Sequence, residues 1–328
     1  DVSACDLAGG AQNSWAPASN HFQMTAYSVC PSNGDWGRGI IVRNGVASSS
    51  LIVGQFSGAN QTFNAPAGTG ITNVRFTGQL FRAAGQRWNV GLTNGSQMLF
   101  GIDGSTTWAF GVNLTDYNVA VPGNQSVYWE VFCVASSGCD AKSTGDAATH
   151  YVRAGAWIRS TVVTINDPTP PNAAWAGSLL SGTWVRGDQS FYWDSNDNSG
   201  ISSASVTLGG RSIISHTGAC NYTVPQPCPS SASGNTMVST TGWPDGGHAM
   251  RIEVRDASGN VNAIDGAAYI DNTAPARISG PAVQGGENWR QSNSFKITWT
   301  NPGGQHAPIT TRHYKLCPTD GGACTTGS

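Results

Sequence analysis

The stretch Asp167-Pro168-Thr169-Pro170-Pro171 returns 104 residues later as Asp271-Asn272-Thr273-Ala274-Pro275. Trp184 and Phe191, which follow the first copy, have counterparts in Trp289 and Phe295 at offsets of 105 and 104 residues. A repeat of about 100 residues that is rich in β-formers and turn residues has the length of one β-sandwich domain. The sequence therefore predicts three units: a head over residues 1–166, a complete module over 167–274, and a partial second module over 275–328. Because that last unit reaches only half a module by Ser328, we expect the natural product to continue.

The composition favours exposed, uncharged β-structure. Hydrophobic residues make up 39% of the 328 residues and charged residues only 11%, against a usual quarter, and there are 42 glycines. Twelve Trp, ten Phe and eight Tyr supply ample core material, which excludes a disordered chain. An all-β protein of two to three domains is the fold class that fits.

The charge distribution excludes two classes of partner. The formal net charge is −2, and no basic or acidic run occurs. Nucleic-acid binding and electrostatic membrane association therefore have no support. No apolar stretch approaches the roughly 18–20 residues of a membrane span, so no membrane insertion is expected in this segment.

The eight cysteines fall into close sequential pairs, an even number in each unit. Metal binding is a poor alternative, because no C-x-x-C motif occurs and no histidine lies at ligand spacing from a cysteine. Although eight cysteines allow about 105 connectivities, pairing within units is the simplest choice. The predicted disulfides, which imply an oxidising, extracellular compartment, are Cys5–Cys30, Cys133–Cys139, Cys220–Cys228 and Cys317–Cys324.

Short apolar or alternating runs bounded by Gly, Asn, Pro or Ser recur through the head. Their spacing of 10 to 20 residues without helical periodicity predicts a two-sheet antiparallel sandwich, a jelly roll of about 160 residues. Trp88, Trp129 and Trp157 lie within these strand patterns and are predicted to be core. The expected strands are 39–43, 50–56, 73–81, 88–92, 127–134 and 151–165.

Three tracts of the second unit carry a resemblance: Asp245-Gly246-Gly247-His248, the turn that ends in Asp256-Ala257-Ser258-Gly259-Asn260, and Asp271-Asn272-Thr273-Ala274-Pro275. Together they are similar to the strand ends of bacterial immunoglobulin-like repeats in large secreted and cell-surface proteins. The resemblance covers residues 168–328 and implies spacer modules rather than catalytic ones. The head in turn resembles the concanavalin-type jelly-roll modules of such surface proteins, a fold that serves binding modules and enzymes alike.

Sugar binding is the chemistry that the head supports best. Sandwich proteins bind sugars through aromatic rings that stack on pyranose faces, flanked by amide, carboxylate and guanidinium groups. Loops around three tryptophans of the head offer this combination, and the alternative for each tryptophan is packing in the core. The predicted ligand-binding residues are Trp15, Asp35, Trp36, Arg38, Asp103 and Trp108.

Catalysis finds weaker support. The segment Tyr151–Trp157 is similar to the Y-x-K-A-G-x-Y strand of alginate-lyase jelly rolls, but the other signatures of that family are missing, and a closing β-strand explains the same residues. An enzyme would need a cleft that brings His150, Tyr151 or Glu130 close to arginines such as Arg75, Arg82 or Arg153. Whether the head has activity stays open, and no catalytic residue is assigned.

A structural calcium ion is the one cofactor that the sequence suggests. The loop from Asp194 to Gly200 offers several oxygens, with Asp194, Asn196 and Asp197 as candidate ligands, although Asx-rich turns mostly cap their own backbone. A second group, formed by Asp256, Asn260 and Asp271, is expected to stiffen the junction with the third unit.

The function that these features predict is that of an extracellular bacterial surface protein. Its head would bind a glycan or another surface ligand, with the immunoglobulin-like units as spacers, in the manner of an adhesin. The alternatives are a structural component of a surface layer or filament, with self-association through the partial C-terminal module, and a carbohydrate-active enzyme of the lyase or hydrolase kind.

Overall fold

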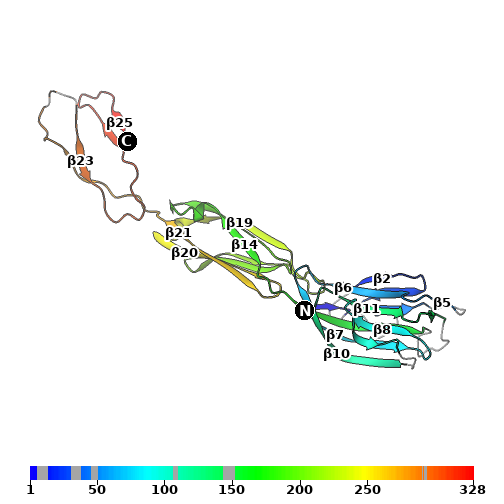
Figure 1. Cartoon of the computed structure of the whole chain (residues 1–328). Coiled ribbons are helices and arrows are strands. Elements are labelled where there is room, and N and C mark those ends of the chain that lie inside the picture. The colour runs from blue at the N-terminus through cyan, green and yellow to red at the C-terminus, as the bar shows by residue number, and fades with distance from the viewer. Residues whose placement is uncertain are drawn as a thin grey trace.

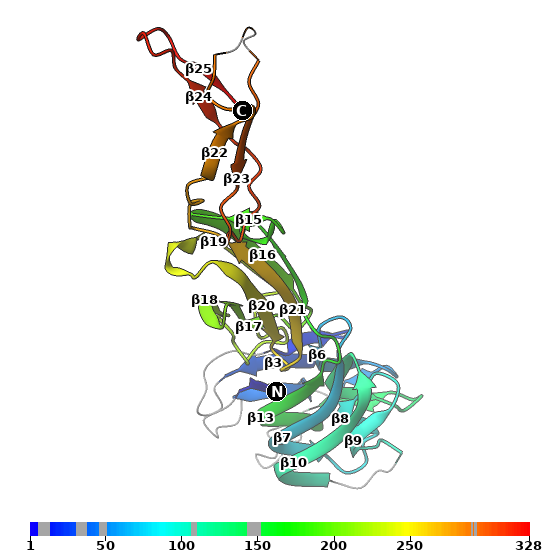
Figure 2. The ribbon, with the colours of Figure 1, turned by 90° about the vertical axis from the view of Figure 1, so that its left-hand side faces the viewer.

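Three parts of the chain follow one another end to end in the computed structural model (Figures 1 and 2). The structure describes residues 1–5, 14–30, 38–45, 51–105, 110–142, 152–289, 291 and 294–328. Its regular structure is almost entirely β, so the prediction of an all-β chain is confirmed. Among the described residues, no helix has the length and hydropathy needed to span a bilayer.

The first part is an antiparallel sandwich of two sheets, which we call the first sandwich. One sheet has the order β10-β7-β13-β4-β3, with β1 paired to β13, and the other has the order β2-β6-β11-β8-β9. A short pair, β12 and β5, lies beside them. The strands are β1 (Val2–Ala4), β2 (Ala16–Ser19), β3 (Met24–Val29), β4 (Gly39–Asn44), β5 (Ile52–Val53), β6 (Gly58–Asn64), β7 (Gly70–Arg82), β8 (Trp88–Thr93), β9 (Met98–Ile102), β10 (Phe110–Asn124), β11 (Ser126–Cys133), β12 (Cys139–Asp140) and β13 (Ala154–Asn166).

The core of the first sandwich lies between the two sheets. Phe76 on β7 meets Trp129 on β11 edge to face, with ring centroids 4.7 Å apart, so the two sheets interlock through aromatic side chains. Strand β11 alternates between buried and half-buried positions, as expected for a strand with one face on the core. Trp88, Trp129 and Trp157 are buried, which confirms their prediction as core residues.

The second part is an immunoglobulin-like sandwich of a three-stranded and a five-stranded sheet, which we call the second sandwich. Its sheets have the orders β14-β16-β19 and β15-β21-β20-β17-β18, and β15 runs parallel to β21. The strands are β14 (Asn172–Ala176), β15 (Trp184–Val185), β16 (Asp188–Asn196), β17 (Ile201–Leu208), β18 (Arg211–Thr217), β19 (Ser231–Ser239), β20 (Gly246–Asp256) and β21 (Val261–Ile270). Two 3₁₀ turns, η2 (Ser178–Leu180) and η3 (Thr240–Gly242), complete it.

Its core is built from alternating residues of the facing sheets, such as Phe191 and Trp193 on β16 with Val206 on β17 and Ile252 on β20.

The C-terminal segment, residues 275–328, holds two hairpin-like pairs: β22 (Ser279–Val283) with β23 (Ile297–Thr300), and β24 (Tyr314–Leu316) with β25 (Thr325–Gly327). Most of its described side chains are exposed.

All four predicted disulfides are confirmed: Cys5–Cys30, Cys133–Cys139, Cys220–Cys228 and Cys317–Cys324. Two of them hold segments close to the boundary between the first and second parts. Cys5–Cys30 ties β1 to the end of β3, and Cys220–Cys228 closes the loop between β18 and β19.

Candidate functional site

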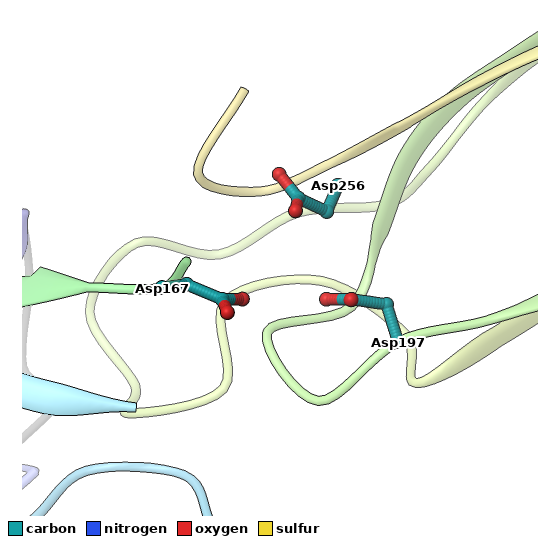
Figure 3. Close-up of side chains that lie close together, drawn as sticks. All are labelled: Asp167, Asp197 and Asp256. Atoms are coloured by element: carbon teal, nitrogen blue, oxygen red, sulfur yellow. The ribbon is translucent and has the colours of Figure 1, made fainter. Parts of the chain in front are cut away.

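Three aspartates from distant parts of the sequence meet where the first sandwich joins the second (Figure 3). Asp167 follows β13, the last strand of the first sandwich, Asp197 follows β16, and Asp256 ends β20. Each offers a carboxylate oxygen, and these oxygens lie within 4.8 Å of one another. We call this cluster the acidic junction.

Asp197 is held by the turn that follows it. Its Oδ1 accepts hydrogen bonds from the Ser199 amide at 2.8 Å, from the Ser199 hydroxyl at 2.7 Å and from the Gly200 amide at 3.0 Å. Gly200 has a φ of +94°, and a Cβ there would collide with the carbonyl group of Cys228, so the turn requires glycine. The sequence Asp-Asn-Ser-Gly therefore fixes the direction of the Asp197 carboxylate.

Asp256 is held by the turn between β20 and β21. Its Oδ1 accepts from the amides of Ser258 at 2.8 Å and Asn260 at 2.9 Å, and its Oδ2 accepts from the Asn260 side chain at 2.7 Å. The same Asn260 side chain donates to the Asp167 carbonyl at 2.9 Å. Asn260 thus links the second sandwich to the linker. Burial raises the pKa of Asp256 above its ordinary value against the opposing effect of the Asn260 hydrogen bonds, and the charge of Asp197 raises it further.

Asp167 is the most unusual member of the cluster. Only 5% of its surface is exposed, and its Oδ1 accepts a hydrogen bond from the Thr169 amide at 3.0 Å. Its Oδ2 is buried and accepts no hydrogen bond from the described residues. Figure 3 shows this carboxylate pointing toward that of Asp197. Among the described residues, no lysine, arginine or histidine forms an ion pair with any of the three aspartates.

Hydrogen bonds between the two sandwiches surround the acidic junction. The Asn198 side chain donates to the Ala67 carbonyl at 3.0 Å, next to Asp197. On the disulfide-closed loop, the Tyr222 carbonyl accepts from the Ser3 amide at 2.9 Å, and the Thr223 carbonyl accepts from the Ser14 hydroxyl. The second sandwich is therefore joined to the first by several direct contacts as well as by the linker.

Of the three predicted calcium ligands, Asp197 belongs to the acidic junction. Asp194 and Asn196 lie within β16, where their side chains alternate with the buried Ser195. The second predicted group needs correction. Asp256 and Asn260 lie at the junction with the first sandwich, whereas Asp271 lies at the opposite end of the second sandwich and accepts from the Ala307 amide at 2.7 Å.

The free end of the first sandwich, remote from the acidic junction, forms a second candidate site. Register places Ser19 opposite Ala59, so the loop at residues 20–23 lies beside the loop at residues 54–57; we call these two loops the tip. Asn20 connects them, because its side chain donates to the Phe56 carbonyl at 2.9 Å and accepts from the Gly58 amide at 2.7 Å. Figure 1 shows the neighbouring β5 at the far end of the molecule from the second sandwich.

The tip exposes two aromatic rings that sequence reasoning missed. Phe22 is 81% exposed and Phe56 65%, and His21 stacks on Phe22 with ring centroids 4.7 Å apart. Phe56 also has a φ of +65°, a conformation that is uncommon for a bulky residue and that points to a local constraint. No sequence pattern marked either phenylalanine, because a lone aromatic residue in a turn carries no period.

The three predicted ligand-binding residues that the structure describes do not form one group. Trp15 is 2% exposed and packs against Phe63, so its ring face is not accessible at the surface. Arg38, directly before β4, is exposed at the end of the first sandwich that faces the second. Asp103 is exposed at the opposite end, where its carbonyl accepts from Arg82. Three further candidates, Asp35, Trp36 and Trp108, lie outside the described residues.

Those residues of the enzyme hypothesis that the structure describes are dispersed. Glu130 lies on β11, and burial raises the pKa of its carboxyl group against an opposing hydrogen bond from Thr93. Arg75 lies on the other sheet and pairs with Asp116, and Arg153 pairs with Asp140 at 3.3 Å. Arg82 is buried, and it donates to backbone carbonyls. His150 and Tyr151 lie outside the described residues.

Comparison with known proteins identifies no family. No protein-family model and no curated protein matches this sequence. Similar solved structures include the fibronectin(III)-like modules of Clostridium thermocellum CbhA, at 12% identity and a TM-score of 0.25 over 71% of this chain and 95% of that chain. Dimeric latent PorU from Porphyromonas gingivalis is another, at 12% identity and a TM-score of 0.26 over 89% of this chain and 27% of that chain. Likenesses this remote carry no argument about function, which has to come from the chain itself.

Proposed function

We propose that this chain is an extracellular surface protein that presents its first sandwich, a head of the jelly-roll type, at the end of a stalk, and that the head binds a glycan in the manner of an adhesin. The observation that carries this proposal is the position of the tip. Two exposed phenylalanines lie on the loops at the end of the first sandwich that is remote from the second sandwich.

The chemistry of the tip suits a sugar. The C–H faces of pyranose rings stack on aromatic rings, while hydroxyl groups need neighbouring amides that both donate and accept hydrogen bonds. Phe22 and Phe56 supply the rings. Asn20, His21 and Gln55 supply polar groups on the same two loops. The loop that contains Asp35, Trp36 and Arg38 remains a second candidate binding segment of the head.

The rest of the chain supports a role outside the cell. Four disulfides suit an oxidising compartment, and sandwiches arranged end to end hold a head at a distance from whatever anchors the other end. The second sandwich and the C-terminal segment act as spacers in this proposal.

The test is a glycan array and polysaccharide pull-down with the full chain, followed by mass analysis of the glycans. We expect retention without cleavage, and a loss of at least about tenfold in affinity for Phe22→Ala and Phe56→Ala, as befits a stacked ring. Trp289→Ala is the matched control, because it removes a fully exposed aromatic ring from the C-terminal segment.

The other outcomes separate the alternatives. Loss of binding in Trp36→Ala alone would move the site to the second candidate loop. Cleaved or unsaturated products would identify the head as a carbohydrate-active enzyme. Absence of any glycan binding, together with concentration-dependent assembly of the chain, would favour a structural role in a surface layer or filament.

A further inference from the structure

We propose that Asp167, Asp197 and Asp256 bind one Ca²⁺ ion between the first and second sandwiches, and that this ion fixes the joint between them. The inference is independent of glycan binding, since it concerns the other end of the first sandwich.

Electrostatic repulsion among the three carboxylates favours a bound cation. Three carboxylates whose oxygens lie within 4.8 Å of one another repel, and two of them are buried. Such a group is ordinarily neutralised by a cationic side chain, by a metal ion or by protons. The described part of the chain supplies no cationic partner: Arg255, the nearest in sequence, pairs with Glu253 at 2.6 Å instead.

The environment of the Asp167 carboxylate independently favours a bound cation. Oδ2 of Asp167 is buried and has no hydrogen-bond donor among the described residues, although its side chain points into the cluster. About nine in ten buried polar groups in proteins have a partner, so an unpartnered carboxylate oxygen needs an explanation. A cation bound between the three aspartates provides that partner.

The donor set selects the kind of cation. Every ligand atom in the cluster is a carboxylate oxygen, and no histidine or cysteine among the described residues belongs to it. Ca²⁺ takes six to eight oxygens at about 2.3–2.6 Å in flexible geometry, so ligands on opposite sides of one ion lie about 4.6–5.2 Å apart. The 4.8 Å span fits within that range. Mg²⁺ demands a smaller, near-octahedral shell, which carboxylates already fixed by their own turns are poorly placed to form.

Hydrogen bonds prepare the aspartates for this role. Asp197 and Asp256 are oriented by the Ser199–Gly200 and Ser258–Asn260 amides, and Asp167 by the Thr169 amide. The ligands therefore come from the linker and from two turns of the second sandwich. An ion bound to all three would stiffen the linker directly after β13, where the first sandwich ends.

The repeat supplies an internal control. At the offset of 104 residues, Asp167 corresponds to Asp271, whereas Asp197 corresponds to Asn301. The Asn301 side chain accepts from the Trp299 indole at 3.0 Å, and Oδ2 of Asp271 accepts from the Ala307 amide at 2.7 Å. Asn301 is also a neutral amide where the acidic junction has the carboxylate of Asp197, so the repeat-equivalent position is not expected to bind the ion.

The test is calorimetric titration of the full chain with CaCl₂ after treatment with EDTA, together with thermal unfolding in both conditions. We expect one Ca²⁺ per chain, with a dissociation constant no weaker than about 1 mM, as in extracellular modules, and a higher midpoint for unfolding of the second sandwich. Asp167→Asn keeps the shape and the Oδ1 acceptor, and it should weaken binding at least about tenfold while raising the midpoint in EDTA, because it removes repulsion.

Asp271→Asn is the matched control and should bind Ca²⁺ as the unaltered chain does. Circular dichroism checks that each variant folds. If Asp167→Asn does not fold, Asp197→Asn replaces it in the same titration and should likewise weaken Ca²⁺ binding. The proposal is overturned if the unaltered chain shows neither binding nor stabilisation up to about 10 mM Ca²⁺, or if Asp167→Asn keeps full affinity. Equal binding of Mg²⁺ would overturn the assignment to calcium.

Discussion

The two junctions of this chain share a linker motif and yet are joined by different means. In the first, Asp167 lies beside two further carboxylates, and no described residue donates a hydrogen bond to its Oδ2. In the second, Asp245 accepts hydrogen bonds from the Asn272 amide at 2.6 Å and from the Thr273 hydroxyl, so both of its oxygens are satisfied.

The pKa values of the carboxyl groups reflect this difference. At the first junction, burial raises the pKa of Asp256. At the second, the Thr273 hydroxyl, followed by the Asn272 amide, holds the pKa of Asp245 below its ordinary value. The same repeat thus provides one joint for which we propose a cation and one that its own hydrogen bonds complete. A linker motif alone therefore does not determine how two modules are connected.

The largest expected effect comes from the turn that orients Asp197. Gly200→Ala forces a Cβ into the Cys228 carbonyl at a φ of +94°, so we expect the second sandwich to lose about 2–5 kcal/mol of unfolding free energy. Gly304→Ala, in the C-terminal segment, also has a positive φ of +78° but meets no atom within 4 Å, and should cost only about 1–2 kcal/mol. Chemical denaturation measures both, and equal losses would contradict the role given to the close contact.

A smaller effect is expected from the disulfide at the first junction. Joint replacement of Cys220 and Cys228 by serine should lower stability by about 2–3 kcal/mol through the entropy of the released loop. It should also loosen the junction, because Tyr222 and Thr223 on this loop contact the first sandwich. Joint replacement of Cys317 and Cys324 should leave limited proteolysis at the first junction unchanged.

Asn260→Ala should cost about 1–3 kcal/mol, because it removes the donor shared by Asp256 and the Asp167 carbonyl and leaves buried acceptors unsatisfied. Thermal unfolding in EDTA measures the loss. An unchanged unfolding midpoint would show that Asn260 does not connect the segment after β13 to the second sandwich. Thr273→Val at the second junction removes one exposed hydrogen bond and is expected to cost less.

The smallest expected effect is the pH dependence of the second junction. Since the pKa of Asp245 is lowered in the folded chain, its carboxylate stabilises the fold above the ordinary value of 3.8 and loses this effect as the pH falls through the lowered value. Asp245→Asn should therefore reduce the unfolding midpoint slightly at pH 7, and the difference should disappear in strong acid. A difference that grows toward low pH would contradict the assignment.

Much of the fold follows from local pattern. The expected strands 88–92 and 127–134 correspond closely to β8 and β11, because apolar residues recur at every second position in both: Trp88, Val90 and Leu92 in β8, and Val127, Trp129 and Val131 in β11. By contrast, β10 was not predicted, although it spans 15 residues. Its register shifts between Leu114 and Tyr117, at a positive φ of Asp116, and again after Ala120, so the period of two is interrupted.

Other predictions were wrong where the local backbone conformation departs from the one that the sequence pattern indicates. The strand predicted over 50–56 is wrong beyond Ile52–Val53, because the chain turns at Phe56 with a positive φ. The acidic junction was likewise predicted only in part from the sequence. Asp197 was recognised from its acidic loop, whereas Asp167 looked only like part of a linker. The two aspartates are 30 residues apart and Asp256 lies a further 59 along the chain, so only the packing of strands brings them together.

Hydrogen exchange measured by mass spectrometry, with and without Ca²⁺, tests the contrast between the two junctions most directly. The amides that orient the acidic junction lie in peptides covering residues 167–171, 197–200 and 256–260, and those of the second junction in peptides covering 271–275 and 305–308. We predict slower exchange in the first set on adding Ca²⁺ and no change in the second. No change in either set, or equal slowing in both, would contradict it.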